Sequence, residues 1–547
     1  MRSRFTFLLF CLIGQGIFFK VYGQEQPKLV IGIVVDQMRY DYLYRYWDDY
    51  SDGGFKRLMN NGYVIHDGHY QYAPTYTGPG HASIYTGTSP NVHGIIGNDW
   101  YDPIKKDYVY CAGDPDANTI GSESFDGKMS PHRLLASTLA DQLELATNHR
   151  SKTLGISLKD RGSILPMGSN PDGAYWYDKT NGRFITSDYY QDKLPEWVQE
   201  FNKKKLVDEY MSKVWNTLLP LEEYDESLPD DKGFERPFPN SEGHTFPYDL
   251  AQLSTQVRFG IKNTPYNLLP ATPFGNTLLV EFAKSMIEHD SLGMDMIPDL
   301  LAISFSSTDY AGHQFGNFSV EVQDVYLRLD RELEAFLNFL DEKIGLDNIL
   351  IFLTADHGAA DVPGIASTPA GYFLANGFEN ALKHRLKEQF GMDVIENFSN
   401  QQIHLVKNDS LDIESVIRSI QEFAFRFPGV KNIVRLNDFS KCVEDATICS
   451  TIRNGIMPGR SGDLYVQLHP GWISESYKAG GTTHGSTYVQ DTHVPILFYG
   501  WRVKPANDYH RVYIQDIAPS VSTLLKIARP SGCTGKIIDN LLSASDQ

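Results

Sequence analysis

Uninterrupted apolar runs of strand length recur along the chain. Four of them cover residues 28–35, 299–305, 348–354 and 494–499. Their apolar residues are continuous rather than alternating, which is typical of strands covered by helices on both faces. The runs therefore predict a largely parallel sheet buried inside an α/β fold.

A long helix is predicted between the second and third of these runs. Its apolar positions recur every three or four residues and form one stripe, which is typical of an amphipathic helix. They are Val322, Val325, Leu329, Leu333, Phe336, Leu337 and Leu340. A strand, a long helix and a second strand make a βαβ unit. Residues 514–527 predict another helix, with Asp516 as a possible N-cap and Pro519 in its first turn.

Two segments fit a common core poorly. Residues 163–270 are rich in aromatic residues, Pro, Asn and Asp, and residues 363–460 have the pattern of a separate lobe. We therefore expect one core, residues 24–362 and 461–547, that carries a cap insertion at about 163–270 and an inserted lobe at 363–460.

The charge balance excludes some partners. Among 547 residues, 49 are basic and 68 are acidic, which gives a formal net charge of −19. This balance argues against nucleic-acid binding and against an electrostatic anchor on anionic lipid. One acidic run lies in the expected cap insertion, and we interpret it as a solvated face rather than a cation site. Its members are Glu222, Glu223, Asp225, Glu226, Asp230 and Asp231.

The N-terminus has the pattern of a secretory signal. Arg2 and Arg4 precede a largely apolar stretch, residues 5–19, which is shorter than the ~20 residues of a membrane-spanning helix. We expect residues 1–23 to be a cleaved signal peptide and the protein to be periplasmic or secreted, without stable membrane insertion. Cleavage would remove three basic residues and no acidic one, which takes the net charge from −19 to −22.

Four cysteines remain after cleavage. An even number in an exported protein suggests two disulfides. Cys442 and Cys449 are close in sequence, so we expect a 442–449 bridge and a second bridge between Cys111 and Cys533. The alternative is that all four are buried thiols.

Acidic and histidine side chains follow the predicted strands. Asp36 follows the first run, Asp309 and His313 follow the second, and Asp356 and His357 follow the third; His484 lies in a Gly-rich loop. In open α/β sheets, ligands bind at the carboxyl ends of the strands. Mixed Asp and His sets suit zinc or a similar ion, and three buried carboxylates need a counter-charge. The pattern therefore predicts a two-metal site.

A candidate nucleophile lies in the segment 74–87. Gly78 and Gly80 allow close backbone approach there, and a helix begins near Thr77. A hydroxyl at a helix N-terminus lies among free N–H groups and can face a phosphate. The alternatives are that Thr77 is only an N-cap, or that Thr75 or Ser83 is the nucleophile.

Together these motifs resemble the alkaline phosphatase superfamily over nearly the whole chain. Pro74-Thr-x-Thr77-x-Pro79-x-His81 is similar to its threonine-nucleophile branch, which includes nucleotide pyrophosphatases/phosphodiesterases and the phosphate-irrepressible alkaline phosphatases of Bacteroidetes; the chain is most like the latter. Asp309-x-x-Gly312-His313, Asp356-His357-Gly358 and Thr483-His484-Gly485 fit the superfamily's ligand motifs in order. The resemblance implies a three-layer catalytic core, with a mostly parallel central sheet, helices on both faces and inserted cap lobes.

The resemblance also implies roles for individual residues. Two Zn²⁺ per subunit are expected, one held by Asp309, His313 and His484 and one held by Asp36, Asp356 and His357. Thr77 would be the nucleophile and would lie between the metals as a shared ligand. Asn98 and the Gly78 N–H would contact the phosphoryl oxygens, and His81 and His93 would be structural. Two zinc ions outweigh three carboxylates, so the acidic chain can still bind an anion.

Lys159 and Arg161 indicate which class of phosphate ester is the expected substrate. They follow residues 152–158, which have a strand pattern. The irrepressible phosphomonoesterases carry such a Lys-x-Arg beside the substrate phosphate, and a monoester dianion has one more charged oxygen than a diester. We therefore expect hydrolysis of small phosphate monoesters through a phosphothreonine. A phosphodiesterase or nucleotide pyrophosphatase is the alternative, and a monomer is plausible.

Overall fold

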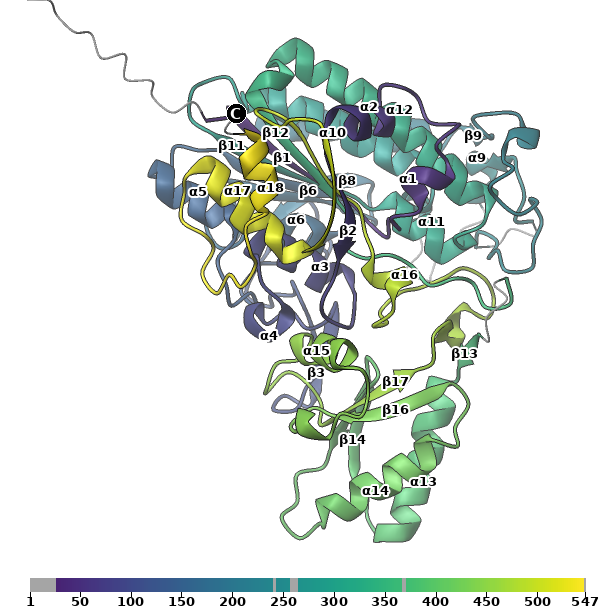
Figure 1. Ribbon diagram of the computed structural model, residues 1–547. Coiled ribbons are helices and arrows are strands. Elements are labelled where there is room, and N and C mark those ends of the chain that lie inside the picture. Colours follow the sequence, from purple (N-terminus) through teal and green to yellow (C-terminus); the bar gives the residue numbers. More distant parts are fainter. Residues whose placement is uncertain (1–25, 240–242, 256–263, 366–369, 546–547) are drawn as a thin grey trace, which may run out of the picture.

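The computed structural model describes residues 26–239, 243–255, 264–365 and 370–545 (Figure 1). The expected signal peptide, residues 1–23, lies outside these ranges. Among the helices of the described ranges, none combines the length and the apolarity that a membrane crossing requires.

A ten-stranded sheet forms the centre of the molecule. Its five middle strands, β12, β1, β11, β6 and β7, are parallel neighbours, which confirms the mostly parallel sheet. In spatial order the sheet consists of β20 (Ala506–Tyr513), β2 (Tyr63–His69), β19 (Ile496–Gly500), β12 (Ile349–Thr354), β1 (Leu29–Val35), β11 (Asp299–Phe305), β6 (Thr153–Ser157), β7 (Gly173–Asp178), β8 (Arg183–Ser187) and β5 (Thr119–Ile120). Leu29 pairs with both Asp299 and Ile349, so the middle strands end at the same edge.

One predicted strand has the opposite direction. Strand β19 pairs antiparallel with both β12 and β2, although we expected a parallel strand there. The segment before β19 carries the His484 loop, which lies at the edge where β12 ends. The chain therefore enters β19 from that edge and must run against β12. Continuous apolarity reports burial on both faces and says nothing about direction.

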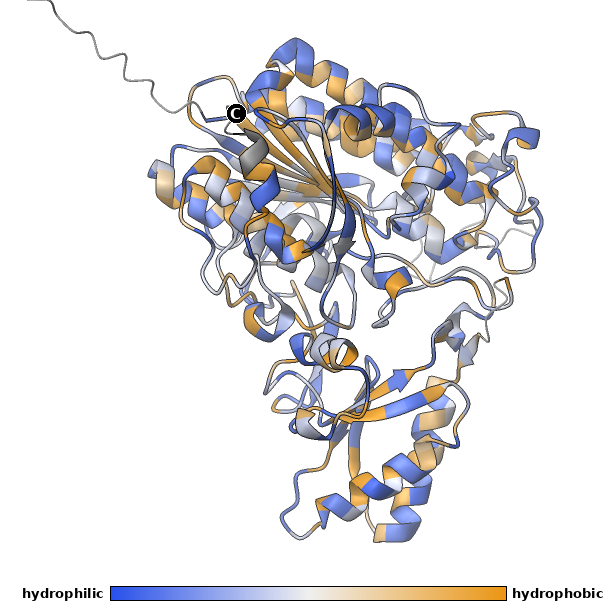
Figure 2. Cartoon of the chain, viewed as in Figure 1, coloured by the Kyte–Doolittle hydropathy of each residue, from blue (hydrophilic) through white to orange (hydrophobic). Residues whose placement is uncertain are grey.

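Helices cover both faces of the sheet. On one side lie α2 (Phe55–Asn61), α10 (Phe274–His289) and α12 (Val320–Lys343) (Figure 1). On the other side lie α3 (Thr77–Thr86), α5 (Leu139–Thr147), α6 (Asp160–Met167) and α17 (Ile517–Leu525) (Figure 1). Every residue of the predicted stripe on α12 is buried, and the sheet strands are the most apolar elements between the helices (Figure 2). The α/β core is thus confirmed.

Part of the expected cap insertion belongs to the core, because β7 and β8 extend the central sheet. The segment that follows wraps around α10 and α12. It contains α7 (Glu196–Lys203), α8 (Leu206–Tyr210), β9 (Val214–Trp215), β10 (Tyr248–Asp249) and α9 (Leu250–Thr255). Most of its acidic run is exposed or half-exposed, as expected, but Asp230 takes part in a largely buried cluster described below.

A separate lobe occupies the lower part of Figure 1. Its four-stranded sheet consists, in spatial order, of β14 (Ile395–Ser399), β15 (Gln402–Leu405), β17 (Leu464–Leu468) and β16 (Val430–Arg435). Helices α13 (Ala375–Phe390) and α14 (Ile413–Ala424) pack on it around a core of their own. Because β17 belongs to this sheet, the lobe extends beyond residue 460, the end that we expected for it. Between the lobe and the central core lies α15 (Ala446–Asn454), and the Asn454 side chain donates to the Gln71 carbonyl at 2.9 Å.

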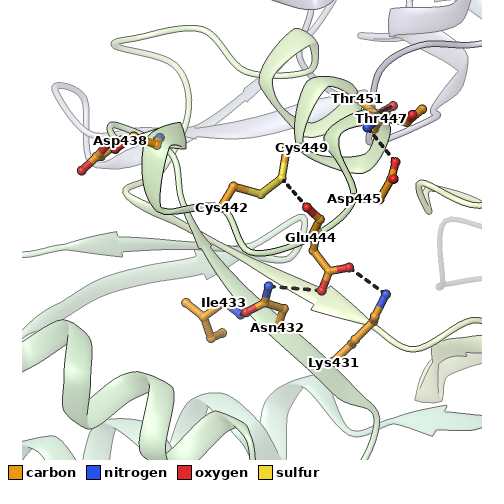
Figure 3. Close-up of a disulfide and its surroundings, with 11 residues drawn as sticks. Lys431, Asn432, Ile433, Asp438, Cys442, Glu444, Asp445, Thr447, Cys449 and Thr451 are labelled. Carbon is orange, nitrogen blue, oxygen red and sulfur yellow. Dashed lines mark hydrogen bonds and ion pairs between the residues drawn. A yellow bond between two sulfur atoms is a disulfide. The ribbon is translucent and has the colours of Figure 1, made fainter.

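The Cys442–Cys449 disulfide is confirmed and lies in this lobe (Figure 3). The second expected bridge is wrong, because Cys111 and Cys533 are free thiols. A Cβ on Gly78 would lie 3.1 Å from the Cys111 sulfur, and a Cβ on Gly87 would lie 2.7 Å from the Cys533 sulfur. The two sulfurs therefore lie beside opposite ends of α3, next to Gly78 and Gly87, which are roughly 13 Å apart at ~1.5 Å per residue, so the cysteines are not placed for a bridge.

Candidate metal centre and nucleophile

The carboxyl ends of three neighbouring strands supply most of the candidate ligands. Asp36 directly follows β1, while Asp356 and His357 follow β12. Helix α11 (Ser307–Phe315), which begins just after β11, carries Asp309 and His313. Because these strands end at one edge, residues far apart in the sequence meet there.

The structure brings the predicted ligands together. Asp36, Asp356 and His357 offer atoms within 4.8 Å of one another, and so do Asp309, His357 and His484. His313 completes the second set, with its Nε2 3.1 Å from Asp309 Oδ1. His484 joins from the loop before α16 (Val489–Thr492), and its ring stacks on His357 at a centroid distance of 3.4 Å.

All three candidate ligand histidines present Nε2 to the centre. His313 Nδ1 lies 2.7 Å from the Thr482 carbonyl, His357 Nδ1 lies 3.0 Å from the Gly358 carbonyl, and His484 Nδ1 lies 2.6 Å from the Thr75 carbonyl. A carbonyl only accepts hydrogen bonds, so each Nδ1 carries the proton. Each Nε2 is then a lone-pair donor, held in place as in zinc sites. Burial lowers the pKa of His357 to about 3, which keeps its ring neutral.

Several ligand atoms lack any other partner. Asp36 Oδ1, Asp356 Oδ2 and His357 Nε2 are buried and have no hydrogen-bond partner among the described residues. Burial, followed by repulsion between the carboxylates, raises the pKa of Asp36 and of Asp356. Such orphaned oxygens and nitrogen are the donor set that zinc prefers. The residues present therefore fit the two expected ions.

Lys159 lies between the two ligand sets. Its Nζ is 2.6 Å from Asp36 Oδ2 and 2.5 Å from Asp309 Oδ2, and its residue is 5% exposed. The lysine follows β6, so the fourth parallel strand also delivers its end residue to this edge. Its single ammonium group is therefore shared between one carboxylate of each set.

Arg161 opens onto a neighbouring cavity. Its guanidinium donates to the Tyr110 hydroxyl at 3.1 Å, while its buried Nε–H has no partner among the described residues. The cavity has a volume of about 290 Å³, and Lys159, Arg161, Trp176, Lys179 and Tyr310 contribute to its walls. Lys179 and Tyr310 were not singled out from the sequence. Nothing in the hydrophobic pattern marks them, because they reach the cavity from separate segments.

Thr77 begins α3, whose first turn lies beside segments that carry both ligand sets. Gly80 lets the first turn of α3 approach Asp356, since a Cβ there would lie 2.4 Å from the Asp356 carbonyl oxygen. On the other side, the Thr75 carbonyl accepts from His484. The Thr77 side chain is buried, and no hydrogen bond of its hydroxyl occurs within the described part of the chain. Tyr76, not Thr77, occupies the N-cap position of the helix.

The rival hydroxyls are engaged elsewhere. Thr75 donates to the Ser486 carbonyl at 3.3 Å. Ser83 lies 3.0 Å from His93 Nε2, and His93 Nδ1 accepts from the Ile95 N–H, so the ring donates to Ser83. His81 bridges the Thr77 carbonyl and the Ser304 hydroxyl. His81 and His93 thus have the structural contacts that the resemblance implies.

Asn98 reaches the start of α3. The Gly78 N–H donates to Asn98 Oδ1 at 2.8 Å, which orients the amide with its NH₂ group as the remaining donor. Gly78 was expected to face the phosphate directly, but its N–H instead holds Asn98. A Cβ on Gly78 would lie 3.3 Å from the same oxygen, so the glycine also makes room for this contact.

Gln37 belongs to the site and was missed from the sequence. Its backbone N–H donates to Asp356 Oδ1 at 3.1 Å, and its side chain donates to Asp309 Oδ1 at 2.8 Å. Its φ of +63° lies in the left-handed region, which non-glycine residues rarely adopt. A polar residue directly after a strand-end Asp is an ordinary turn residue by pattern, so nothing in the sequence marked it.

Comparison with known proteins agrees with this geometry. A family model described as type I phosphodiesterase/nucleotide pyrophosphatase matches residues 30–490. The chain belongs to this family. The superfamily that the motifs predict is thereby confirmed.

Several similar proteins share nearly the whole chain. Alkaline phosphatase PhoV of Synechococcus elongatus is 43% identical over 94% of this chain and 93% of its own. Alkaline phosphatase PafA of Elizabethkingia meningoseptica is 42% identical over 96% of both chains. The crystal structure of wild-type PafA matches with a TM-score of 0.90, covering 94% of this chain and 99% of that one. A PafA variant with one Thr, one Asn, one Lys and one Arg substituted matches at a TM-score of 0.89 and 41% identity, with the same coverage.

Proposed function

We propose that this chain is an exported, zinc-dependent alkaline phosphatase that hydrolyses phosphate monoesters through a phosphothreonine at Thr77. One observation carries the proposal. Thr77 begins α3, whose first turn packs beside the Asp356 and His484 segments, its hydroxyl has no hydrogen-bond partner among the described residues, and each buried ligand set has a carboxylate that contacts Lys159. The relatives named alkaline phosphatases, at 42–43% identity over almost the full length, support the same activity.

The ligand sets assign the two expected ions. Asp309, His313 and His484 would hold one zinc ion, and Asp36, Asp356 and His357 would hold the other, with Thr77 shared between them. When bound, the two ions supply Lewis-acid stabilisation of the attacking and leaving oxygens and favour the deprotonated nucleophile.

The protein groups position the reacting atoms. Thr77 Oγ1 attacks phosphorus in line with the leaving group, and the ester oxygen departs with the bonding pair. Water then cleaves the phosphothreonine, which restores the hydroxyl and releases inorganic phosphate. Asn98, held by Gly78, directs its NH₂ group toward an equatorial oxygen, and the partly unpaired Arg161 guanidinium faces another, where negative charge collects.

Lys159 and Arg161 favour a monoester over a diester. A monoester dianion presents an extra charged oxygen, and a Lys–Arg pair beside it compensates that charge. The substituted residues of the PafA variant are of the same four types as Thr77, Asn98, Lys159 and Arg161. The substituted Thr and Asn are separated by the same number of residues as Thr77 and Asn98. The substituted Lys and Arg are separated by the same number as Lys159 and Arg161. The family description, which names phosphodiesterases, keeps the diesterase as the second candidate.

The decisive experiment compares p-nitrophenyl phosphate with bis-p-nitrophenyl phosphate as substrates of the zinc-loaded protein. A monoesterase gives a kcat/KM for the monoester at least about 100-fold above that for the diester, a difference of about 2.7 kcal/mol in transition-state binding. A preference for the diester would reject the proposal in favour of the second candidate.

Export remains part of the proposal. The apolar stretch 5–19 behind Arg2 and Arg4 supports a signal peptide, and the Cys442–Cys449 disulfide fits an oxidising compartment. N-terminal sequencing of the mature protein, isolated from periplasm and medium, tests cleavage after residue 23.

A further inference from the structure

A second group of buried carboxylates lies outside the metal centre. Asp230 and Glu235 come from the segment before β10, and Glu321 comes from the first turn of α12. They offer oxygens within 4.8 Å of one another. Glu235 is 2% exposed and Glu321 is 0% exposed. Three acids from two separate segments therefore point into one space that is largely closed to solvent.

Each carboxylate is held by one fixed donor. The Tyr248 hydroxyl donates to Glu321 Oε1 at 2.5 Å, the Lys232 N–H donates to Glu235 Oε2 at 3.0 Å, and the Phe246 N–H donates to Asp230 Oδ2 at 3.0 Å. The other oxygen of each group is buried and has no hydrogen-bond partner among the described residues. These oxygens are Glu321 Oε2, Glu235 Oε1 and Asp230 Oδ1.

Basic side chains do not account for the three free oxygens, and no hydrogen bond joins one of these oxygens to another. The nearby His244 ring lies 3.1 Å from Asp231 Oδ1 and 3.9 Å from Glu235 Oε2, the oxygen that Lys232 already serves. The surroundings are aromatic, with the Tyr248 ring packed against Phe238 and Phe315. Carboxylates in such surroundings need a compensating positive charge.

We propose that Asp230, Glu235 and Glu321 bind a calcium ion. Calcium takes carboxylate oxygens at 2.3–2.6 Å, so two ligands of one ion lie at most about 5 Å apart, and one oxygen from each of the three residues meets this limit. The set contains only oxygen, which disfavours zinc. Magnesium keeps most of its waters and demands octahedral geometry, whereas this enclosed cluster of three carboxylates suits the more flexible shell of calcium.

The calcium site would also stabilise the segments that position ligands of the catalytic metal centre. The Gly481 N–H donates to the Phe234 carbonyl at 2.7 Å, and the Arg236 N–H donates to the Gln314 carbonyl at 2.9 Å. Gln314 is the neighbour of His313, and Gly481 precedes Thr482, whose carbonyl orients the His313 ring. An ion bound to Asp230 and Glu235 would therefore hold the segment 230–237, against which the end of α11 and the His484 loop rest.

Calcium binding can be measured without any activity assay. The full-length protein, with zinc kept in the buffer to occupy the catalytic centre, is freed of calcium by dialysis and then titrated with CaCl₂. We expect one calcium ion per chain by elemental analysis and a saturable rise in Tm of about 2 °C or more. Terbium(III) should replace calcium and luminesce on excitation of Tyr248, which contacts Glu321, and Trp215, whose ring lies 5.4 Å from that of Tyr248.

Charge-neutral variants locate the ion. Glu321→Gln and Glu235→Gln keep the side-chain shape and should each weaken calcium binding at least about tenfold and abolish the sensitised terbium luminescence. Glu222→Gln removes the same charge from an exposed residue of the acidic run that contains Asp230 and should behave as the wild type.

Three outcomes would overturn the proposal. They are absence of bound calcium in the wild type, unchanged affinity in both variants, or an equal rise in Tm with magnesium. If the variants do not fold, the stoichiometry and luminescence of the wild type still decide. All these readouts are independent of phosphatase activity, so failure here leaves the proposed function untouched.

Discussion

Gly312 leaves the space that the side chain of Gln37 occupies. A Cβ on Gly312 would lie 1.9 Å from Gln37 Oε1. The same glutamine side chain donates to Asp309, and its backbone N–H donates to Asp356. One residue thus steadies a carboxylate in each ligand set, and the glycine of the Asp309-x-x-Gly312-His313 motif is required for that contact.

Gly312→Ala should therefore act through Gln37. The new methyl group displaces the amide and breaks its bond to Asp309, with an expected loss of about 10- to 100-fold in zinc affinity or kcat/KM. Gly312 lies inside α11, where alanine is favoured over glycine by about 1 kcal/mol, so the variant should not unfold more easily. Zinc competition with a chromogenic chelator and thermal melting separate the two effects.

The matched control is Gln37→Ala, which removes the same hydrogen bond without a clash. If both substitutions act on one contact, the double variant should be no worse than the more affected single variant. Independent, multiplying losses in the double variant would show that Gly312 serves another purpose.

Replacement of Thr77 tests the nucleophile. Thr77→Ala should lower kcat by orders of magnitude while both zinc ions remain bound, because every candidate ligand other than Thr77 is kept. Thr77→Ser keeps a hydroxyl and should retain much of the activity. Metal content by elemental analysis and burst kinetics, which report the phosphoenzyme, are the measurements.

The two rival hydroxyls supply the controls. Ser83→Ala leaves the N–H of His93 without its acceptor and should cost about 1–3 kcal/mol of stability, but it should not abolish turnover. Thr75→Val should likewise remain active, since the His484 ring is held by the Thr75 backbone carbonyl rather than by its hydroxyl. Loss of turnover in either variant, with Thr77→Ala still active, would move the nucleophile.

The sequence predicted the elements whose signal is local. Continuous apolar runs located β1, β11 and β12, and their ends located Asp36, Asp309 and Asp356, because parallel strands deliver their end residues to one edge. The direction of β19 was not predictable, since burial on both faces looks the same in either direction. Cys111 and Cys533 could not be assigned from spacing, because they lie at opposite ends of a helix that appears only in the fold.

Contacts and burial that arise only from the fold were also not predictable from the sequence. Gln37 acts through a left-handed turn and a side chain that Gly312 admits, and neither leaves a periodic signal. Asp230 belongs to a sequence run of acids that is mostly exposed, and only the fold separates it from its neighbours by placing it beside Glu321. Burial of single polar residues depends on partners distant in the sequence.

Arg161→Ala should separate monoester from diester hydrolysis. Its guanidinium has an unpaired N–H near the cavity, so its loss should lower kcat/KM for p-nitrophenyl phosphate about 10- to 100-fold. Hydrolysis of the bis ester should change less than threefold, because a diester lacks the additional charged oxygen. Equal losses for both substrates would contradict the assigned role.

Lys159→Ala should have a broader effect. Its ammonium group contacts Asp36 and Asp309 as well as the cavity, so removal should weaken zinc binding and lower the hydrolysis of both substrates. Comparison of Lys159→Ala with Arg161→Ala, each with measured zinc content, distinguishes the loss of a substrate contact from the loss of a contact to the metal ligands. Lys179→Ala, in the same cavity but bonded to the Tyr310 hydroxyl, is the charge-matched control.

Stability in the absence of calcium should depend on Glu235. Burial, more than any neighbouring charge, raises the pKa of Glu235 to about 7. The folded state then holds a proton that the unfolded chain releases near its ordinary value of about 4.5. The contribution to stability is therefore fully present below about pH 4.5 and is lost as the pH rises through about 7. Calcium, which replaces that proton, should remove the loss.

The measurement is the Tm of calcium-free protein between pH 5 and 8, compared with that of Glu235→Gln. Burial also raises the pKa of Glu144 to about 7 and of Asp299 to about 6, so both proteins should lose stability over this range. The wild type should lose more, because the glutamine cannot ionise, and only the wild type should regain the difference with calcium. Parallel curves for the two proteins without calcium would show that Glu235 is not the titrating group.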